Sequence, residues 1–228
     1  MILLIAAVLA AAAPAAPACP DVVTPDAFVC RALAAQQAGE DETAAQAFEQ
    51  AAQASSDKEP ATARMWAAAG NLWIAAGKPG KAALALDRAL ALPGLQAEQR
   101  GEALLDRARA AEAQNDLKTA RARLNEAVST ISDDPFFWYF SASLAIREED
   151  KATAQTAIGK ALSLAPADPA ILFEAGHVAH FAGDDVGARD YWTRAAAADP
   201  KGPIGKAARD ALVLLPAPLT VKTGQPRS

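Results

Sequence analysis

The chain has 228 residues, with 22 basic against 27 acidic side chains and a net charge of −5. This balance provides no broad basic surface of the kind that nucleic-acid-binding proteins carry. The apolar residues are mostly Ala and Leu, and aromatic residues make up only 6% of the chain, a composition that favours helix over strand. We therefore expect a helical protein that does not bind nucleic acid.

The N-terminus differs in composition from the rest of the chain. Residues 2–13 form an unbroken apolar run, and Ala16-Pro17-Ala18 follows it. A short apolar run before a small-x-small site is typical of a secretory signal peptide, and the run is shorter than the about 20 residues that span a bilayer. We predict a signal peptide at 1–18 and export to the periplasm or cell envelope. The alternatives are an uncleaved anchor and a mis-assigned start, because no Lys or Arg precedes the run.

Cys19 and Cys30, the two cysteines of the chain, lie just past this site. In an oxidising compartment a disulfide between them would pin an extended mature N-terminus, residues 19–24, onto the first helix. Two unpaired thiols are the alternative. A third possibility is a membrane-anchored lipoprotein assembly factor lipidated at Cys19, although Ala16-Pro17-Ala18 lacks the Leu that usually precedes a lipidated cysteine.

From residue 25 onward, apolar residues recur at helical spacing and turn residues interrupt them regularly. The pattern predicts helices over 26–38, 41–54, 61–76 and 81–92, a third pair that turns at Asn115-Asp116, and a final helix over 206–215. The five pairs are expected to begin near Pro25, Ala63, Gly101, Pro135 and Pro169. Asp134 and Asp168 precede proline and are expected to cap the fourth and fifth pairs. Residues 216–228 contain three prolines, show no periodicity and are predicted to be a disordered tail.

The last two pairs repeat each other at an interval of 34 residues. Pro135 matches Pro169, and Pro166 matches Pro200. Large and small residues match at the same interval: Trp138 with Leu172, Ala142 with Gly176, and Ile158 with Trp192. A repeat of this length indicates a solenoid built from helix pairs.

Two stretches resemble the tetratricopeptide repeat (TPR) family over roughly residues 25–200. One is Trp66-x2-Ala69-Gly70-x2-Trp73 followed by Ala82, Leu86 and Ala89; the other is Leu172-x2-Ala175-Gly176-x2-Ala179 followed by Ala188, Trp192, Ala195 and Pro200. The resemblance implies an all-α, right-handed α-solenoid of about five antiparallel helix pairs with a C-terminal capping helix, over residues 25–215. It also implies that Gly70 and Gly176 lie where the helices of a pair cross closely.

In this family the first helices of successive pairs line a concave groove that binds an extended peptide or a partner's helix. The resemblance therefore implies a protein partner and a scaffold without enzymatic activity or a cofactor. Only Asn71 fits the family's carboxylate clamp, since Ala67 stands where a Lys is needed. Projection of the first helices places these residues in the groove: Arg64, Asn71, Arg109, Phe136, Tyr139, Arg147, Phe173, His177 and Phe181. Aromatic residues beside Arg are typical of binding hot spots, and most of them collect in the C-terminal half.

His177 and His180 are the candidate metal ligands. Residues three apart share a helix face, so both could bind one ion. A structural metal site needs about four ligands, however, and neither cysteine is near in sequence, so we favour two polar groove residues. A metal-binding or metal-delivery protein is the alternative function. With only two histidines, both on one predicted helix, a nucleophilic catalytic triad is not expected.

Overall fold

A computed structural model describes residues 19–215, and over this range it contains eleven α-helices and no strand. The predicted signal peptide (1–18) and tail (216–228) lie outside the described residues. No helix within 19–215 has both the length and the apolar character that a membrane span needs. The helices are α1 (Pro25–Gln37), α2 (Asp41–Ala54), α3 (Pro60–Ala75), α4 (Pro79–Ala91), α5 (Ala97–Ala113), α6 (Leu117–Ala127), α7 (Pro135–Arg147), α8 (Lys151–Leu164), α9 (Pro169–Ala182), α10 (Asp185–Ala198) and α11 (Pro203–Leu214).

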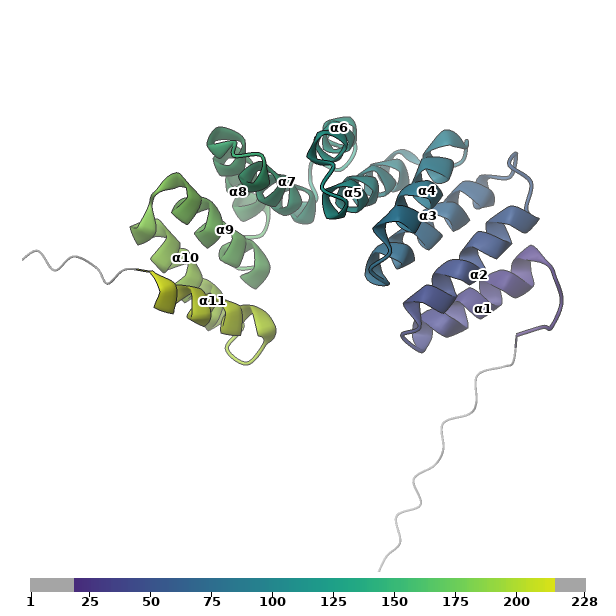
Figure 1. The fold of residues 1–228 in the computed structure, drawn as a ribbon, viewed down its shortest axis with the longest axis horizontal. Coiled ribbons are helices and arrows are strands. Elements are labelled where there is room, and N and C mark those ends of the chain that lie inside the picture. The colour runs from purple at the N-terminus through teal and green to yellow at the C-terminus, as the bar shows by residue number, and fades with distance from the viewer. Residues whose placement is uncertain (1–18, 216–228) are drawn as a thin grey trace, which may run out of the picture.

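The helices pack in consecutive pairs, from α1 with α2 to α9 with α10. Figure 1 shows the pairs following one another as an arch, with α1 and α2 at one end and α10 and α11 at the other. The last helix, α11, packs on α10 and α9 and covers apolar residues of the fifth pair, as a solenoid end requires. This arrangement confirms the predicted all-α solenoid of five helix pairs with a capping helix.

The predicted starts of the second and third pairs were three to four residues late. These pairs begin at Pro60 and Ala97 instead of Ala63 and Gly101. Proline is favoured in the first helical turn, and Gln96 and Gln99 form a reciprocal capping box at the start of α5. The final helix likewise begins at Pro203. The apolar pattern alone therefore placed the starts of α5 and α11 about one helical turn late, whereas the helix predicted over 61–76 differs from α3 by one residue.

The predicted aspartate caps are present. Asp134 accepts a hydrogen bond from the backbone N–H of Phe136, and Asp168 accepts from Ala170 and Ile171. Each capped helix starts with proline, so sequence and geometry agree on where these two pairs begin.

The turn inside each pair contains one residue with positive φ. The five residues are Gly39, Gly77, Asn115, Glu149 and Gly183. Glycine adopts this left-handed conformation without steric cost and asparagine tolerates it. Glu149, at φ 60°, is the strained member of the set.

Two glycines mark close crossings within pairs, as predicted. A β-carbon on Gly70 would overlap the side chain of Leu86, and one on Gly176 would overlap the indole of Trp192. The partner of each glycine is fully or nearly fully buried. Glycine at these positions lets the two helices of the second and fifth pairs approach closely.

The N-terminal segment is fastened to α1. Cys19 and Cys30 form a disulfide, which is one of the three states that the sequence left open for these cysteines. The Arg31 guanidinium donates hydrogen bonds to the carbonyls of Pro20 (3.0 Å) and Val22 (3.1 Å). Cys19 in this state has no free thiol to carry a lipid.

Candidate partner-binding site on the inner face

The first helices of the pairs lie beside one another along the arch. Helix α3 contacts α5, and α7 contacts α9. Between α5 and α7 the connection is made by side chains, because Arg109 lies over the ring of Phe136 at 5.6 Å from its centroid. We call the surface formed by α3, α5, α7 and α9 the inner face. Two hollows on this face are lined by predicted groove residues.

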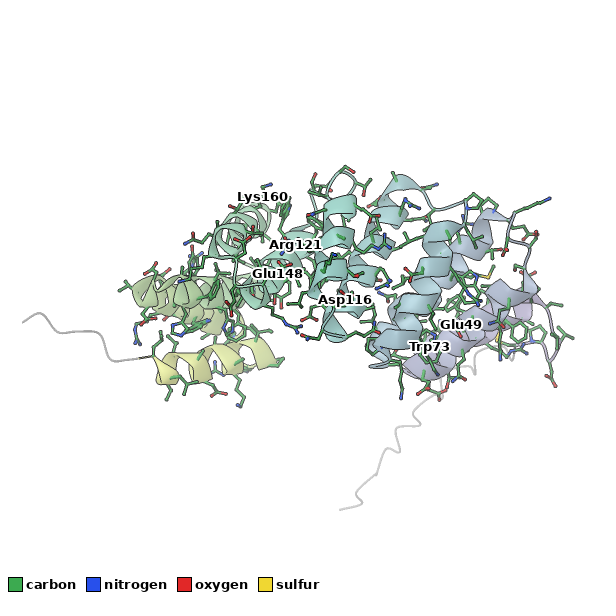
Figure 2. The ribbon with its side chains drawn as sticks, turned by 45° about the horizontal axis from the view of Figure 1, so that its top comes forward. Glu49, Trp73, Asp116, Arg121, Glu148 and Lys160 are labelled. Atoms are coloured by element: carbon green, nitrogen blue, oxygen red, sulfur yellow. A yellow bond between two sulfur atoms is a disulfide. The ribbon has the colours of Figure 1, made fainter. Side chains whose placement is uncertain are left out.

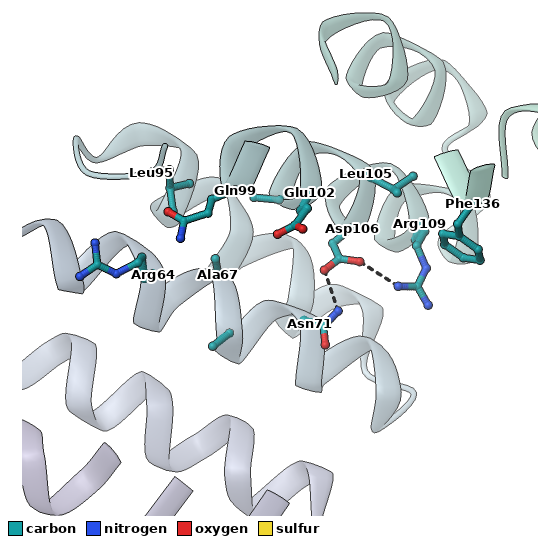
Figure 3. Close-up of a pocket in the computed structure, with 12 residues that line it drawn as sticks. Arg64, Ala67, Asn71, Leu95, Gln99, Glu102, Leu105, Asp106, Arg109 and Phe136 are labelled. Atoms are coloured by element: carbon teal, nitrogen blue, oxygen red, sulfur yellow. Dashed lines mark hydrogen bonds and ion pairs between the residues drawn. The ribbon is translucent and has the colours of Figure 1, made fainter. Parts of the chain in front are cut away.

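The middle hollow lies between α3, α5 and the start of α7, and its volume is about 430 Å³. Figure 3 shows the side chains that line it. Four of the predicted groove residues are among them: Arg64, Asn71, Arg109 and Phe136. The structure therefore brings together residues that are up to 72 positions apart in the sequence (136 − 64 = 72).

Asp106 organises the polar part of the middle hollow. Its carboxylate accepts a hydrogen bond from Asn71 (2.8 Å) and one from Arg109 (2.8 Å), both drawn in Figure 3. Only 14% of the Asp106 side chain is exposed. Arg109 is thereby held in place beside Phe136, which reduces the side-chain entropy that a ligand would have to remove. The projection of the helix faces did not include Asp106.

The α5 side of the middle hollow is acidic. Burial raises the pKa of Glu102, and the nearby carboxylates of Glu98, Asp106 and Asp134 raise it further. Arg109 is already paired with Asp106. The charge that this wall presents to a ligand is therefore negative.

The C-terminal hollow lies between α7 and α9, and its volume is about 510 Å³. Its lining residues are Ser143, Ile146, Arg147, Glu174, His177, His180 and Phe181. Three of them, Arg147, His177 and Phe181, were predicted to be in the groove. Two other predicted residues do not line it. Tyr139 is half-buried and stacks on Phe136 at 5.4 Å between ring centroids, and Phe173 packs edge-on against His177 at 4.5 Å.

Arg147 does not extend freely into the groove. Its guanidinium forms an ion pair with Glu112 and donates hydrogen bonds to the Glu112 carbonyl (3.1 Å) and to Asn115 Oδ1 (2.8 Å). These contacts tie the end of α7 to the end of α5. Arg147 therefore serves the joint between the third and fourth pairs as well as lining the hollow.

The two histidines have different surroundings. His177 is half-buried, and its pKa is lowered by burial and then by the nearby His180. The Nδ1 atom of His180 lies 2.7 Å from Asp185 Oδ1. Among the described residues, no three His, Cys, Asp or Glu side chains gather in a way that could hold a metal ion. The histidine pair thus has no third protein ligand within residues 19–215.

Glu174 is a residue of this hollow that the groove projection missed. It is only 7% exposed, and burial raises its pKa to about 7 while a hydrogen bond from Ser143 lowers it. The signal in the sequence is an acid inside the apolar stretch Ile171 to Val178. An acid in such a stretch, on the first helix of a pair, faces either the core or the groove.

Comparison with known proteins identifies the fold. No family model matches the sequence, and no curated protein sequence is similar to it. Solved structures do match. MamA superposes with a TM-score of 0.62 at 18% identity over 84% of this chain and 98% of MamA. PilW, a type IV pilus biogenesis factor, superposes with a TM-score of 0.68 at 19% identity, over 81% of this chain and 82% of PilW. YrrB, a TPR protein with an unusual peptide-binding site, superposes with a TM-score of 0.60 at 16% identity, over 81% of this chain and 91% of YrrB. The chain therefore has a TPR-like solenoid fold.

Proposed function

We propose that this protein is a non-enzymatic scaffold that binds an extended peptide or a partner's helix along its inner face. The observation that carries the proposal is the pair of hollows on adjacent first helices. Together they offer aromatic rings and fixed polar groups on one continuous surface. Solenoids use such extended concave surfaces to bind other proteins.

The middle hollow supplies the strongest anchor for a partner. Phe136 is a large apolar side chain that is 43% exposed, and it lies between Arg109 and Tyr139. Aromatic and Arg side chains in a hollow that excludes water contribute most of the energy of many protein interfaces. Because Asp106 already holds Arg109, little ordering would be needed on binding.

Export to the periplasm or cell envelope is part of the proposal. The apolar run 2–13, the small-x-small site at 16–18 and the Cys19–Cys30 disulfide support it, since disulfides persist in oxidising compartments. N-terminal sequencing of the protein isolated from its native cells provides the test. We expect a chain that begins at Cys19, and an intact Met1 would contradict export with cleavage.

Site-specific photocrosslinking tests the binding face. The photoreactive residue p-benzoylphenylalanine replaces Phe136 in one variant and Leu84 in another. Leu84 is an apolar residue that is 69% exposed on α4, the second helix of its pair. We expect cells that express the Phe136 variant to yield a discrete adduct on irradiation. The Leu84 variant serves as the matched control.

The crosslinked protein would be identified by mass spectrometry in each case. An adduct at Phe136 that is missing at Leu84 supports binding on the inner face. The same adducts at both positions, or an adduct at Leu84 alone, would overturn the assignment. Circular dichroism of the purified variants checks that each retains its helical content.

A further inference from the structure

Glu174 is a buried carboxylate that the fold does not neutralise. It lies on α9, lines the C-terminal hollow and is 7% exposed. A side-chain hydrogen bond with Ser143 favours its charged form, but none of the ion pairs within residues 19–215 includes it. Arg147, the cation that lines the same hollow, is engaged by Glu112 and Asn115.

The ionised form of a carboxylate in this position is unfavourable in free energy. Removing an anion from water without a cation nearby is unfavourable by several kcal/mol, so the group takes up a proton at a higher pH than usual. The pKa of about 7 reflects that burial. Groups with such properties inside a hollow are often the groups that bind a ligand, because an incoming cation would restore the missing charge.

The walls of the C-terminal hollow suit a cation as well. Phe181 lies at one side, and Lys151 already approaches its ring, with Nζ 5.4 Å from the centroid. Burial holds the pKa of His177 below its usual value, so near neutral pH this ring is uncharged and does not repel a cation. Faces of aromatic rings attract ammonium and guanidinium groups.

We propose that the C-terminal hollow binds a lysine or arginine side chain of the partner, with Glu174 as its counter-ion. The inference rests on the proposed function and specifies the partner's chemistry. The bound segment would be basic, since Glu98 and Glu102 on α5 have no ion-pair partner within residues 19–215, whereas Arg109 is already held by Asp106. Glu174 would contact the charged group of the partner's lysine or arginine at the floor of the hollow. Phe181 would pack against the alkyl part of that side chain.

The two histidines make the test direct. The chain contains two His, and both line this hollow, so the Hε1 resonances in a proton NMR spectrum report on it without a labelled partner. Nα-acetyl-arginine amide serves as the probe and Nα-acetyl-citrulline amide as its uncharged isostere. The titration is run near pH 8, about one unit above the pKa at which Glu174 ionises.

We expect the arginine probe to shift the His177 and His180 signals saturably in the wild type. The citrulline probe should leave them in place. Glu174→Gln keeps the shape and removes the charge, so it should weaken the arginine titration at least tenfold. Glu40→Gln removes the same charge from the exposed turn between α1 and α2 and should titrate like the wild type.

Equal shifts from both probes, or an unchanged titration in Glu174→Gln, would overturn the proposal. So would the absence of any saturable shift in the wild type. These results would leave partner binding at the middle hollow standing, because the photocrosslinks at Phe136 test that separately. If Phe136 gives no photocrosslink but the arginine probe titrates as expected, the scaffold function is overturned and the cation site is still supported.

The cation site should also weaken on acidification. Protonation neutralises Glu174, while protonation of His177 adds positive charge to the same hollow, so both changes act against a cation. The charged or titratable groups around Glu174 are Tyr139 and Arg147 on α7, Lys151 on α8, the N-cap residue Asp168 of α9, His177 and His180 on α9, and Asp185 on α10. A titration by the arginine probe that is as strong near pH 5 as near pH 8 would contradict the role of Glu174.

Discussion

The indole of Trp192 packs over the α-carbon of Gly176 and donates a hydrogen bond from Nε1 to the carbonyl of Phe173 (3.0 Å). This contact joins the two helices of the fifth pair. Trp192 is 3% exposed, so the indole nitrogen is satisfied by the backbone of α9 instead of by water. The close approach of α9 and α10 depends on the absence of a side chain at Gly176.

Gly176→Ala should therefore destabilise the protein. Although Ala is the better helix former by about 1 kcal/mol, its β-carbon would overlap the indole, and overpacking costs about 1–3 kcal/mol. Gly159→Ala is the matched control. Gly159 lies inside α8, and a β-carbon there would meet nothing within 4 Å, so we expect a stabilisation of about 0.5–1 kcal/mol. Urea unfolding followed by circular dichroism measures both; a stabilised Gly176→Ala would contradict the described packing.

Glu149→Gly should stabilise the turn between α7 and α8. Glu149 has φ 60°, a conformation that costs an ordinary residue about 1 kcal/mol or more and that glycine adopts freely. Its side chain is exposed, so little packing is lost. We expect a gain of about 0.5–1 kcal/mol in the free energy of unfolding. Asp57→Gly, at an exposed position in the α2–α3 connection without positive φ, should give no such gain.

Arg121 should be the most important arginine at the joint between the third and fourth pairs. It extends from α6 to α7, where it pairs with Glu148 (2.6 Å) and donates to the Ser141 hydroxyl (3.0 Å); Figure 2 shows the arginine and the glutamate together. Both charged side chains are about one-fifth exposed. Arg121→Ala is expected to cost about 1–3 kcal/mol, as charge-assisted hydrogen bonds of this kind do.

The control for Arg121 is Lys206→Ala. Lys206 forms an i,i+4 pair with Asp210, and its side chain is 73% exposed, so its loss should change stability by less than about 0.5 kcal/mol. Equal urea midpoints for the two variants would show that the Arg121 contacts do not stabilise the joint.

Glu174 should make stability fall as pH rises toward neutrality. Its pKa is 4.5 in the unfolded chain and about 7 in the fold, so the folded protein binds the proton more tightly. The stabilisation by that proton is present below about pH 4.5 and is lost as pH rises to about 7. The shift corresponds to about 3 kcal/mol at most.

Comparison with Glu174→Gln isolates this effect, because other groups such as His177 titrate in both proteins. The two proteins should unfold at similar urea concentrations near pH 5. Near pH 8, Glu174→Gln should be the more stable by up to about 3 kcal/mol. If the difference in the free energy of unfolding between wild type and Glu174→Gln is constant from pH 5 to pH 8, Glu174 titrates as an exposed acid does.

The sequence was sufficient for the architecture because the fold repeats. Pro135 and Pro169 with their preceding aspartates specify helix starts locally, and Gly70 and Gly176 mark the crossings. The predicted starts at Ala63 and Gly101 failed for a physical reason. The first turn of α5 carries Glu98, Gln99 and Arg100 and begins with the Gln96–Gln99 capping box, so apolar periodicity does not reveal it; at α3 the repeat start was placed three residues late although the helix predicted over 61–76 begins one residue from Pro60.

The site was less predictable, because its charges are arranged by contacts between different pairs. The helix-face projection placed Arg109 and Arg147 in the groove but did not predict their ion pairs with Asp106 and Glu112. Glu174 was also missed as a groove residue. Whether a carboxylate beside apolar residues has a cationic neighbour depends on the adjacent helix pair, and the spacing within one helix does not specify that neighbour.

Partner binding along the inner face is the property that most needs a direct measurement. Its most direct test uses the segment that crosslinks at Phe136, synthesised as a peptide and titrated calorimetrically into three proteins. These are the wild type, Phe136→Ala and the exposed control Leu84→Ala. We predict that Phe136→Ala weakens binding at least tenfold, as hot-spot residues do, while Leu84→Ala stays within about twofold of the wild type. Unchanged binding by Phe136→Ala, or a loss in Leu84→Ala alone, would contradict the assignment of the inner face as the binding surface.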